Sequence, residues 1–133
     1  MAAFPGMGVF LENQGGTLFL AWYHYGEDGT SRWWSAGIYD EGRRGWLYPG
    51  QLGGDGKAFT KQGGEIFKQE AWNHVKVEAK GDTLKTWLNG TARAEIKDSM
   101  TPAGFIALQV HGVGKQVEPL EIRWRNIRLK ELP

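Results

Sequence analysis

Apolar and polar residues alternate along most of this chain with a period of two, which is typical of β-strands rather than helices. The clearest run is residues 72–80, where Val75, Val77 and Ala79 are interleaved with charged or polar residues. An Asn89-Gly90 pair follows further on, and both residues tolerate the positive φ angles of a tight hairpin turn. The second half is therefore predicted to hold consecutive antiparallel strands at residues 72–80, 83–88 and 91–97.

The first half gives a similar but less regular pattern. Turn residues such as Asp28-Gly29 separate three alternating runs, and they predict strands at residues 7–13, 17–25 and 30–39. Residues 40–71 are rich in glycine and keep no sustained period, so they are predicted to form a long ordered loop with a short strand at 65–68. No segment predicts a helix.

Two further strands are expected near the C-terminus. Residues 104–112 are apolar on both faces, which predicts a central strand covered on both sides. Residues 120–132 form the last predicted strand, and its apolar residues change face part-way along. One extra residue near Arg125-Asn126 would restore the pattern, so a bulge or bend is expected there. About eight strands in antiparallel hairpins predict an all-β fold, an antiparallel β-sandwich or jelly-roll.

Composition narrows the classes of function. The chain has 133 residues, which suits a single domain over residues 1–133 with a core of its own. It lacks cysteine, which excludes disulfides and thiolate metal sites, and its net charge of +1 gives no indication of a nucleic-acid partner. No apolar run reaches the length of a membrane span, and the first residues show no signal-peptide pattern.

Seven tryptophans are more than a core of this size needs, and charged and aromatic residues are concentrated in residues 37–49. Carboxylates and guanidinium groups bind sugar hydroxyls, and aromatic rings stack on the apolar face of a sugar. The alternative is that Asp40 and Glu41 pair with Arg43 and Arg44 only to hold the loop. Both interpretations stay open. The candidate residues of this stretch are Tyr39, Asp40, Glu41, Arg43, Arg44, Trp46 and Tyr48.

Two other pairs are candidates for a binding site. Gln109 and His111 share one face of the predicted strand at 104–112, where two polar residues are unusual for a pure core. Lys85 and Trp87 share the outward face of the strand at 83–88, where Trp87 is either a stacking surface or a cross-strand packing residue. A lone histidine is more often structural than functional. No histidine spacing typical of a metal site occurs, so no cofactor is expected and a divalent metal is only a weak alternative.

Four blocks of the chain resemble the 3-keto-disaccharide hydrolase family over about residues 37–132. They are GIYDEGRRGWLYP, AWNHVKVEAKGDTLKTWLNG, MTPAGFIALQVHGVG and IRWRNIRLKEL. The resemblance implies a concanavalin-like β-sandwich that acts on a small carbohydrate. It implies catalytic roles for His111, Asp40, Glu41, Arg43 and Arg44. It implies substrate-binding roles for Tyr39, Trp46, Tyr48, Trp87, Gln109 and Lys85.

The implied reaction cleaves a glycoside oxidised at C3. The keto group acidifies the neighbouring C–H, so His111, Asp40 or Glu41 would remove that proton while Arg43 or Arg44 stabilises the enolate. The alternatives are a non-catalytic carbohydrate-binding or structural β domain, and a natural or engineered hybrid without activity. These differ in whether the protein cleaves, only binds, or ignores sugars.

The first 36 residues resemble the family less well and are interpreted as an atypical N-terminal hairpin joined to the family-like part at 37–133. The sandwich is therefore expected to be shortened. Unpaired sheet edges tend to pair with another chain, so we expect a homodimer that completes the sandwich through its exposed edges. The resemblance suggests a bacterial periplasmic or extracellular protein, although no signal peptide is visible.

Overall fold

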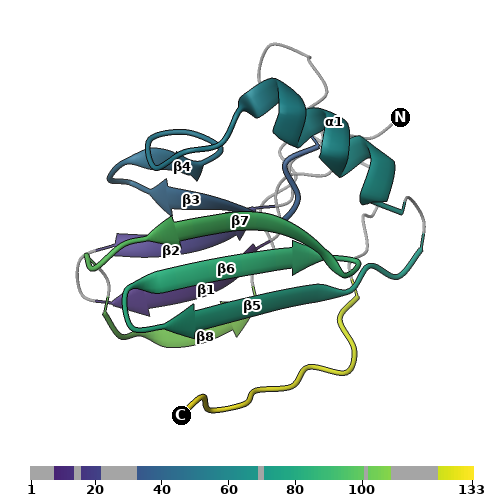
Figure 1. Ribbon diagram of the computed structural model, residues 1–133. Coiled ribbons are helices and arrows are strands. Elements are labelled where there is room, and N and C mark those ends of the chain that lie inside the picture. Colours follow the sequence, from purple (N-terminus) through teal and green to yellow (C-terminus); the bar gives the residue numbers. More distant parts are fainter. Residues whose placement is uncertain (1–7, 14–15, 22–32, 69–70, 101, 109–122) are drawn as a thin grey trace, which may run out of the picture.

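Two antiparallel sheets face each other across an apolar core in this computed structural model (Figure 1). The structure describes residues 8–13, 16–21, 33–68, 71–100, 102–108 and 123–133. The five-stranded sheet has the order β4 (Gly45–Tyr48), β3 (Gly37–Glu41), β2 (Gly16–Ala21), β1 (Gly8–Asn13) and β8 (Phe105–Leu108). The three-stranded sheet has the order β5 (Val75–Lys80), β6 (Thr83–Leu88) and β7 (Thr91–Lys97). The predicted all-β sandwich is thus confirmed.

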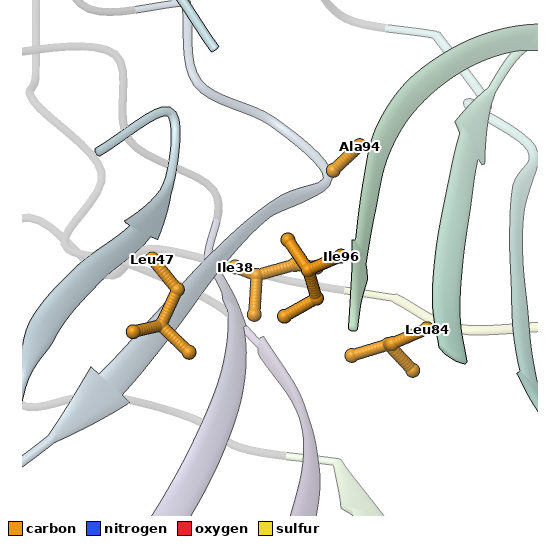
Figure 2. Packing of buried hydrophobic residues seen from close by; sticks show 5 residues of the cluster. All are labelled: Ile38, Leu47, Leu84, Ala94 and Ile96. Carbon is orange, nitrogen blue, oxygen red and sulfur yellow. The ribbon is translucent and has the colours of Figure 1, made fainter. Parts of the chain in front are cut away.

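The core lies where β7 packs against β3 and β4. Ile38 and Leu47 from the larger sheet meet Leu84, Ala94 and Ile96 from the smaller one, and Figure 2 shows these five side chains converging between the sheets. Burying side chains of this size contributes about 1.5–3 kcal/mol each. This contact joins the two sheets on the side of β4 and β7, whereas β5 and β8 are the outer strands on the opposite side (Figure 1).

The three strands of the smaller sheet match the predictions well. Strand β6 has the predicted bounds, β7 does too, and β5 begins three residues later than expected. The strand predicted at 30–39 is confirmed at residues 37–39 and wrong at residues 33–36, because β3 begins only at Gly37. Ala36 has a φ of 63°, and the Gly37 N–H donates to the Trp34 carbonyl over 2.8 Å, so the chain turns before it enters the sheet.

An α-helix, α1 (Gly56–Ile66), occupies the region for which a loop and a strand at 65–68 were predicted, so that prediction is wrong. Asp55 caps the helix by accepting a hydrogen bond from the Ala58 N–H. The helix buries Phe59 and Gly63, which are one turn apart. Glycine normally disfavours helices, and tertiary packing of this face overcomes that preference. Within the described residues, α1 is the only helix, and it is too short and too polar to span a membrane.

Two predictions for the C-terminal part are also wrong where the structure describes it. Strand β8 is an edge strand that pairs with β1 alone among the described strands, and Phe105 and Ile106 are exposed rather than covered on both faces. Residues 123–133 form no strand, and Ile127 and Leu129 are 69% and 80% exposed. Asn126 has a φ of 54°, but residues 123–133 form no strand, so the bulge or bend predicted within a strand near Arg125-Asn126 is not borne out.

Candidate functional site

A cavity of about 380 Å³ lies where α1 meets β6 and β7. Side chains from β4, from the N-terminal half of α1 and from the two strands surround it. The lining residues are Tyr48, Asp55, Ala58, Phe59, Gln62, Lys85, Thr86, Trp87, Ala92, Arg93, Ala94 and Glu95. Pockets of this size and mixed lining are typical of small-molecule sites.

Two β-bulges direct side chains toward this cavity. In β4, Tyr48 pairs with Ile38 and Trp46 with Tyr39, so Leu47 is the extra residue. Strict alternation would place Leu47 and Tyr48 on opposite faces, yet both pack on the core cluster. In β7, Arg93 is the extra residue opposite the step from Thr86 to Trp87. Bulges commonly re-aim side chains beside functional sites, and here they bring Tyr48 and Arg93 to the same cavity.

Arg93 is 4% exposed, and all of its hydrogen-bond acceptors are neutral. Its Nε donates to the Ser35 carbonyl, Nη2 donates to the Trp33 carbonyl, and Nη1 donates to the Phe59 carbonyl and Gln62 Oε1, over 2.6–3.1 Å. Its guanidinium carbon also lies 3.4 Å from the centre of the Phe59 ring. Burial lowers the pKa of Arg93 to about 10, so the side chain is still a cation at neutral pH.

Trp87 is half-buried and lines the cavity. Lys76, its partner on β5, places its ammonium nitrogen 4.2 Å from the centre of the Trp87 ring. Its partner on β7 is Ala92, whose small side chain leaves space beside the ring. Next to Trp87, Lys85 and Glu95 form an ion pair with a distance of 3.1 Å between Nζ and Oε1.

Tyr48 is held by the loop that leads into α1. Its ring meets Phe59 edge-on, with 5.6 Å between the ring centres. A β-carbon at Gly54 would lie 2.9 Å from the Tyr48 ring, and Gly54 has a φ of +81°, so only glycine lets the backbone pass this closely. Part of the glycine richness of this region therefore comes from packing around one aromatic ring.

The charged residues of the turn between β3 and β4 form a separate network. Asp40 is fully buried and accepts hydrogen bonds from Nε of Arg43, at 2.8 Å, and from Nε of Arg44. Arg44 also donates to both carboxylate oxygens of Asp98, at 3.2 and 2.6 Å. These contacts raise the pKa of Arg44 and, led by the hydrogen bond from Arg44, lower the pKa of Asp98. The ion pairs that hold the turn are thus present at Asp40, whereas Glu41 is exposed.

This network and the cavity lie at opposite ends of β7. Arg93 is near the start of that strand and Asp98 directly follows its end, a separation of roughly 16 Å along an extended chain. Of the predicted site residues, the structure brings Tyr48, Lys85 and Trp87 together at the cavity. Asp40, Glu41, Arg43 and Arg44 do not line it, and neither do Tyr39 and Trp46, whose rings contact each other at 5.1 Å. Gln109 and His111 lie outside the described residues.

The sequence model of the 3-keto-alpha-glucoside-1,2-lyase-like domain family matches residues 7–130. The chain belongs to this family. The matched range also includes residues 7–36, for which the resemblance was weaker. No curated protein matches the chain significantly.

Several cavity residues of this family member were missed by reasoning from the sequence. Asp55, Phe59 and Gln62 belong to a helix and its cap that were not predicted, although an Asp followed by a run without proline was a usable start signal. In the strand predicted at 91–97, strict alternation puts Arg93 and Glu95 on the outward face, opposite Ala92, Ala94 and Ile96. The bulge at Arg93 breaks that alternation, and the sequence carries no local signal for it.

Proposed function

We propose that the cavity beside α1 binds a small carbohydrate. Membership of the 3-keto-alpha-glucoside-1,2-lyase-like family supports a sugar ligand, and the lining supports this particular location. Sugars combine hydroxyl groups with apolar ring faces, and protein sites for them combine hydrogen-bonding side chains with an aromatic ring. The cavity offers Trp87 and Tyr48 as rings and Lys85, Glu95 and Gln62 as polar partners.

The observation that carries this proposal is the environment of Trp87. One ring face is covered by Lys76, and the neighbouring β7 residue is the small Ala92. A tryptophan that served only in cross-strand packing would be expected to pair with a larger residue than Ala92. Here the remaining surface of the ring lines a cavity large enough for a monosaccharide.

The test is a calorimetric titration with methyl α-glucoside and its 3-keto derivative, using the wild-type protein, Trp87→Ala and Trp72→Ala. Trp72 is also partly exposed but lies outside the cavity and contacts Arg125, so it is a matched control. We expect Trp87→Ala to weaken binding at least tenfold and Trp72→Ala to leave it unchanged, because loss of a stacking ring costs about 1–3 kcal/mol. Equal affinities of all three proteins would contradict the site.

Cleavage is the second candidate, and the lyase named in the family description favours it. In the proposed step a base removes the proton at C2 of a 3-keto-glycoside, the C–H electrons form the C1–C2 double bond, and the aglycone leaves from C1 and is protonated. His111 is the proposed base, with Asp40 and Glu41 as alternatives and Arg43 or Arg44 as the group that stabilises the enolate. This candidate places the reacting sugar at the turn between β3 and β4 and not in the cavity, whose lining lacks the residues of this turn. Because both oxygens of Asp40 accept from guanidinium groups, Asp40 is the weakest of the three.

This second candidate is tested by incubating the protein with 4-nitrophenyl 3-keto-α-glucoside and measuring the released nitrophenol. We expect release by the wild-type protein and its loss in His111→Ala. Unchanged turnover in that variant would remove His111 from the mechanism. Binding without release would leave a carbohydrate-binding module, and neither binding nor release would favour a domain without sugar chemistry.

We also propose that two copies associate through exposed sheet edges. Strands β5 and β8 end their sheets on the same side of the sandwich, and the side chains of Phe105 and Ile106 are exposed on β8 (Figure 1). Exposed edges with apolar side chains are the surfaces at which strands of another chain can pair.

A further inference from the structure

We propose that the ligand of the cavity carries a single negative charge, as the carboxylate of a uronic acid does, and that Arg93 selects it. This inference rests on the proposed sugar-binding function and specifies its substrate class. It is carried by one buried cation beside the cavity and by the partners of every other charged group in the lining.

The charged lining residues other than Arg93 are already engaged. Lys85 and Glu95 form an ion pair with each other. Asp55 accepts the hydrogen bond from Ala58 that caps α1, over 2.7 Å, and the positive end of the helix offsets its charge. Arg93 instead donates to three backbone carbonyls and one side-chain amide oxygen. It is thus the charged lining residue that the described contacts leave without a compensating charge.

The missing opposite charge is energetically costly because Arg93 is buried. A charge removed from water is costly unless an opposite charge lies near it, and charges interact more strongly inside a protein than in water. The lowered pKa of Arg93 has the same physical cause, since burial disfavours the cationic form. An anion in the cavity would supply the missing opposite charge, and it would therefore be attracted more strongly than a neutral sugar of the same shape.

The hydrogen bonds of Arg93 also limit the kind of anion. A guanidinium has five N–H groups. Four of them already donate to protein acceptors. Arg93 therefore cannot form the bidentate hydrogen bonds by which arginines often bind a phosphate or carboxylate. The attraction is therefore mainly between charges, and one positive charge is balanced by one negative charge. This favours a monoanionic carboxylate over a dianionic phosphate.

A purely structural role for Arg93 gives a different expectation. Its hydrogen bonds connect strand β7 to α1 and to the segment before β3. Such bonds would hold the helix in place and give the protein no preference for the charge of a ligand. Both roles predict that loss of Arg93 harms stability. Only the ligand role predicts that wild-type affinity depends on the charge of the sugar.

The test compares methyl α-glucoside, methyl α-glucuronide and glucose 6-phosphate by titration calorimetry at about 20 and 300 mM NaCl. We expect the glucuronide to bind roughly tenfold more tightly than the glucoside at low salt, and the difference to shrink as salt screens the charges. Equal affinities for glucoside and glucuronide would overturn the inference while leaving sugar binding intact. Tighter binding of the phosphate would overturn the preference for a monoanion. No binding of any of the three sugars would contradict the proposed function itself.

Variants of Arg93 distinguish a role in selecting the ligand from a role in folding. Arg93→Lys keeps a cation and should keep the glucuronide preference, and Arg93→Met should lose the preference if it folds. Lys97→Met is the matched control, because it removes an exposed cation from the same strand outside the cavity. If Arg93→Met does not fold, the salt dependence of glucuronide binding by the wild-type protein and the glucuronide preference of Arg93→Lys still test whether Arg93 selects the ligand. A glucuronide preference that is retained in folded Arg93→Met would overturn the role of Arg93.

Discussion

Gly63 illustrates how a single backbone position fixes the helix beside the cavity. A β-carbon there would lie 1.8 Å from the Trp33 carbonyl oxygen and 2.8 Å from Nη2 of Arg93, which no local adjustment relieves. The helix approaches the segment before β3 this closely only because residue 63 has no side chain. A residue that is unfavourable for helix formation is therefore required by the packing of that helix.

Substitution of Gly63 tests this close approach. We expect Gly63→Ala to lower the free energy of unfolding by about 2–3 kcal/mol, because the helix must move away from Trp33. Gly64→Ala is the matched control: its β-carbon would contact the edge of the Trp33 ring at 3.3 Å, and alanine favours the helix by about 1 kcal/mol. Chemical denaturation of both variants is the measurement. Equal stabilities would show that the approach at residue 63 is looser than described.

Asp98 gives a prediction for pH dependence. Its pKa is lowered mainly by the hydrogen bond from Arg44, so its ion pair stabilises the protein above about pH 4 and this contribution is lost as pH falls through the lowered pKa. We expect Asp98→Asn to lose about 1–2 kcal/mol of stability at pH 7. We also expect it to be less sensitive to acid than the wild type. Denaturation curves between pH 7 and 2.5 measure both effects, and parallel curves for the two proteins would contradict this account of Asp98.

Among the elements, those bounded by strong turn residues were predicted best. Strand β6 lies between a turn at Gly81 and the Asn89-Gly90 pair, and its bounds agree with the prediction. The outward face predicted for Lys85 and Trp87 leaves Leu84 and Leu88 inward, and both leucines are buried. Hairpins of this kind are fixed by local chemistry, because the turn sets the register and the register sets the buried face.

The elements that sequence reasoning missed depend on distant contacts. The glycines of α1 argue against a helix locally, and its stability comes from packing on Trp33, Trp34 and Arg93. The bulge at Arg93 likewise has no local signature. For this reason the sequence predicted three residues of the cavity, Tyr48, Lys85 and Trp87, but not the arginine and the helix that complete it.

The ion pairs of the turn between β3 and β4 are expected to stabilise the fold. We expect Asp40→Ala to destabilise the protein by about 2–4 kcal/mol, because it leaves Arg43 and Arg44 without their buried partner. Glu41→Gln is the control, since Glu41 is exposed at the end of the same strand. Sugar affinity of the folded Asp40→Ala protein should remain at the wild-type value. A selective loss of affinity without loss of stability would instead support a direct role of Asp40 in the site.

At the scale of the whole molecule, the contacts between the two sheets are concentrated on one side of the sandwich in the part of the chain that the structure describes. The core joins β7 to β3 and β4, and α1 covers that side, whereas β5 and β8 form the opposite side (Figure 1). The exposed apolar residues Ile106, Ile127 and Leu129 lie in β8 and in the C-terminal segment. The uneven exposure of the two sides is the structural basis for the proposed association.

The oligomeric state follows as a prediction. We expect the wild-type protein to sediment as a dimer at tens of micromolar, and Ile106→Lys to sediment as a monomer with an unchanged circular dichroism spectrum, because a charge on the exposed face of β8 opposes pairing. Lys97→Met, in the strand on the side where the two sheets contact each other, should remain dimeric. A wild-type monomer at these concentrations would contradict the proposed association without affecting the cavity.

The most direct test of the central claim is to locate the sugar by nuclear magnetic resonance. The backbone and indole signals of ¹⁵N-labelled protein would be followed during titration with methyl α-glucoside and methyl α-glucuronide. We expect the largest shifts at Trp87, Arg93 and the first half of α1, and unchanged signals at Arg44 and Asp98. Shifts centred on the turn at Asp40–Arg44, with the cavity residues unaffected, would contradict this expectation.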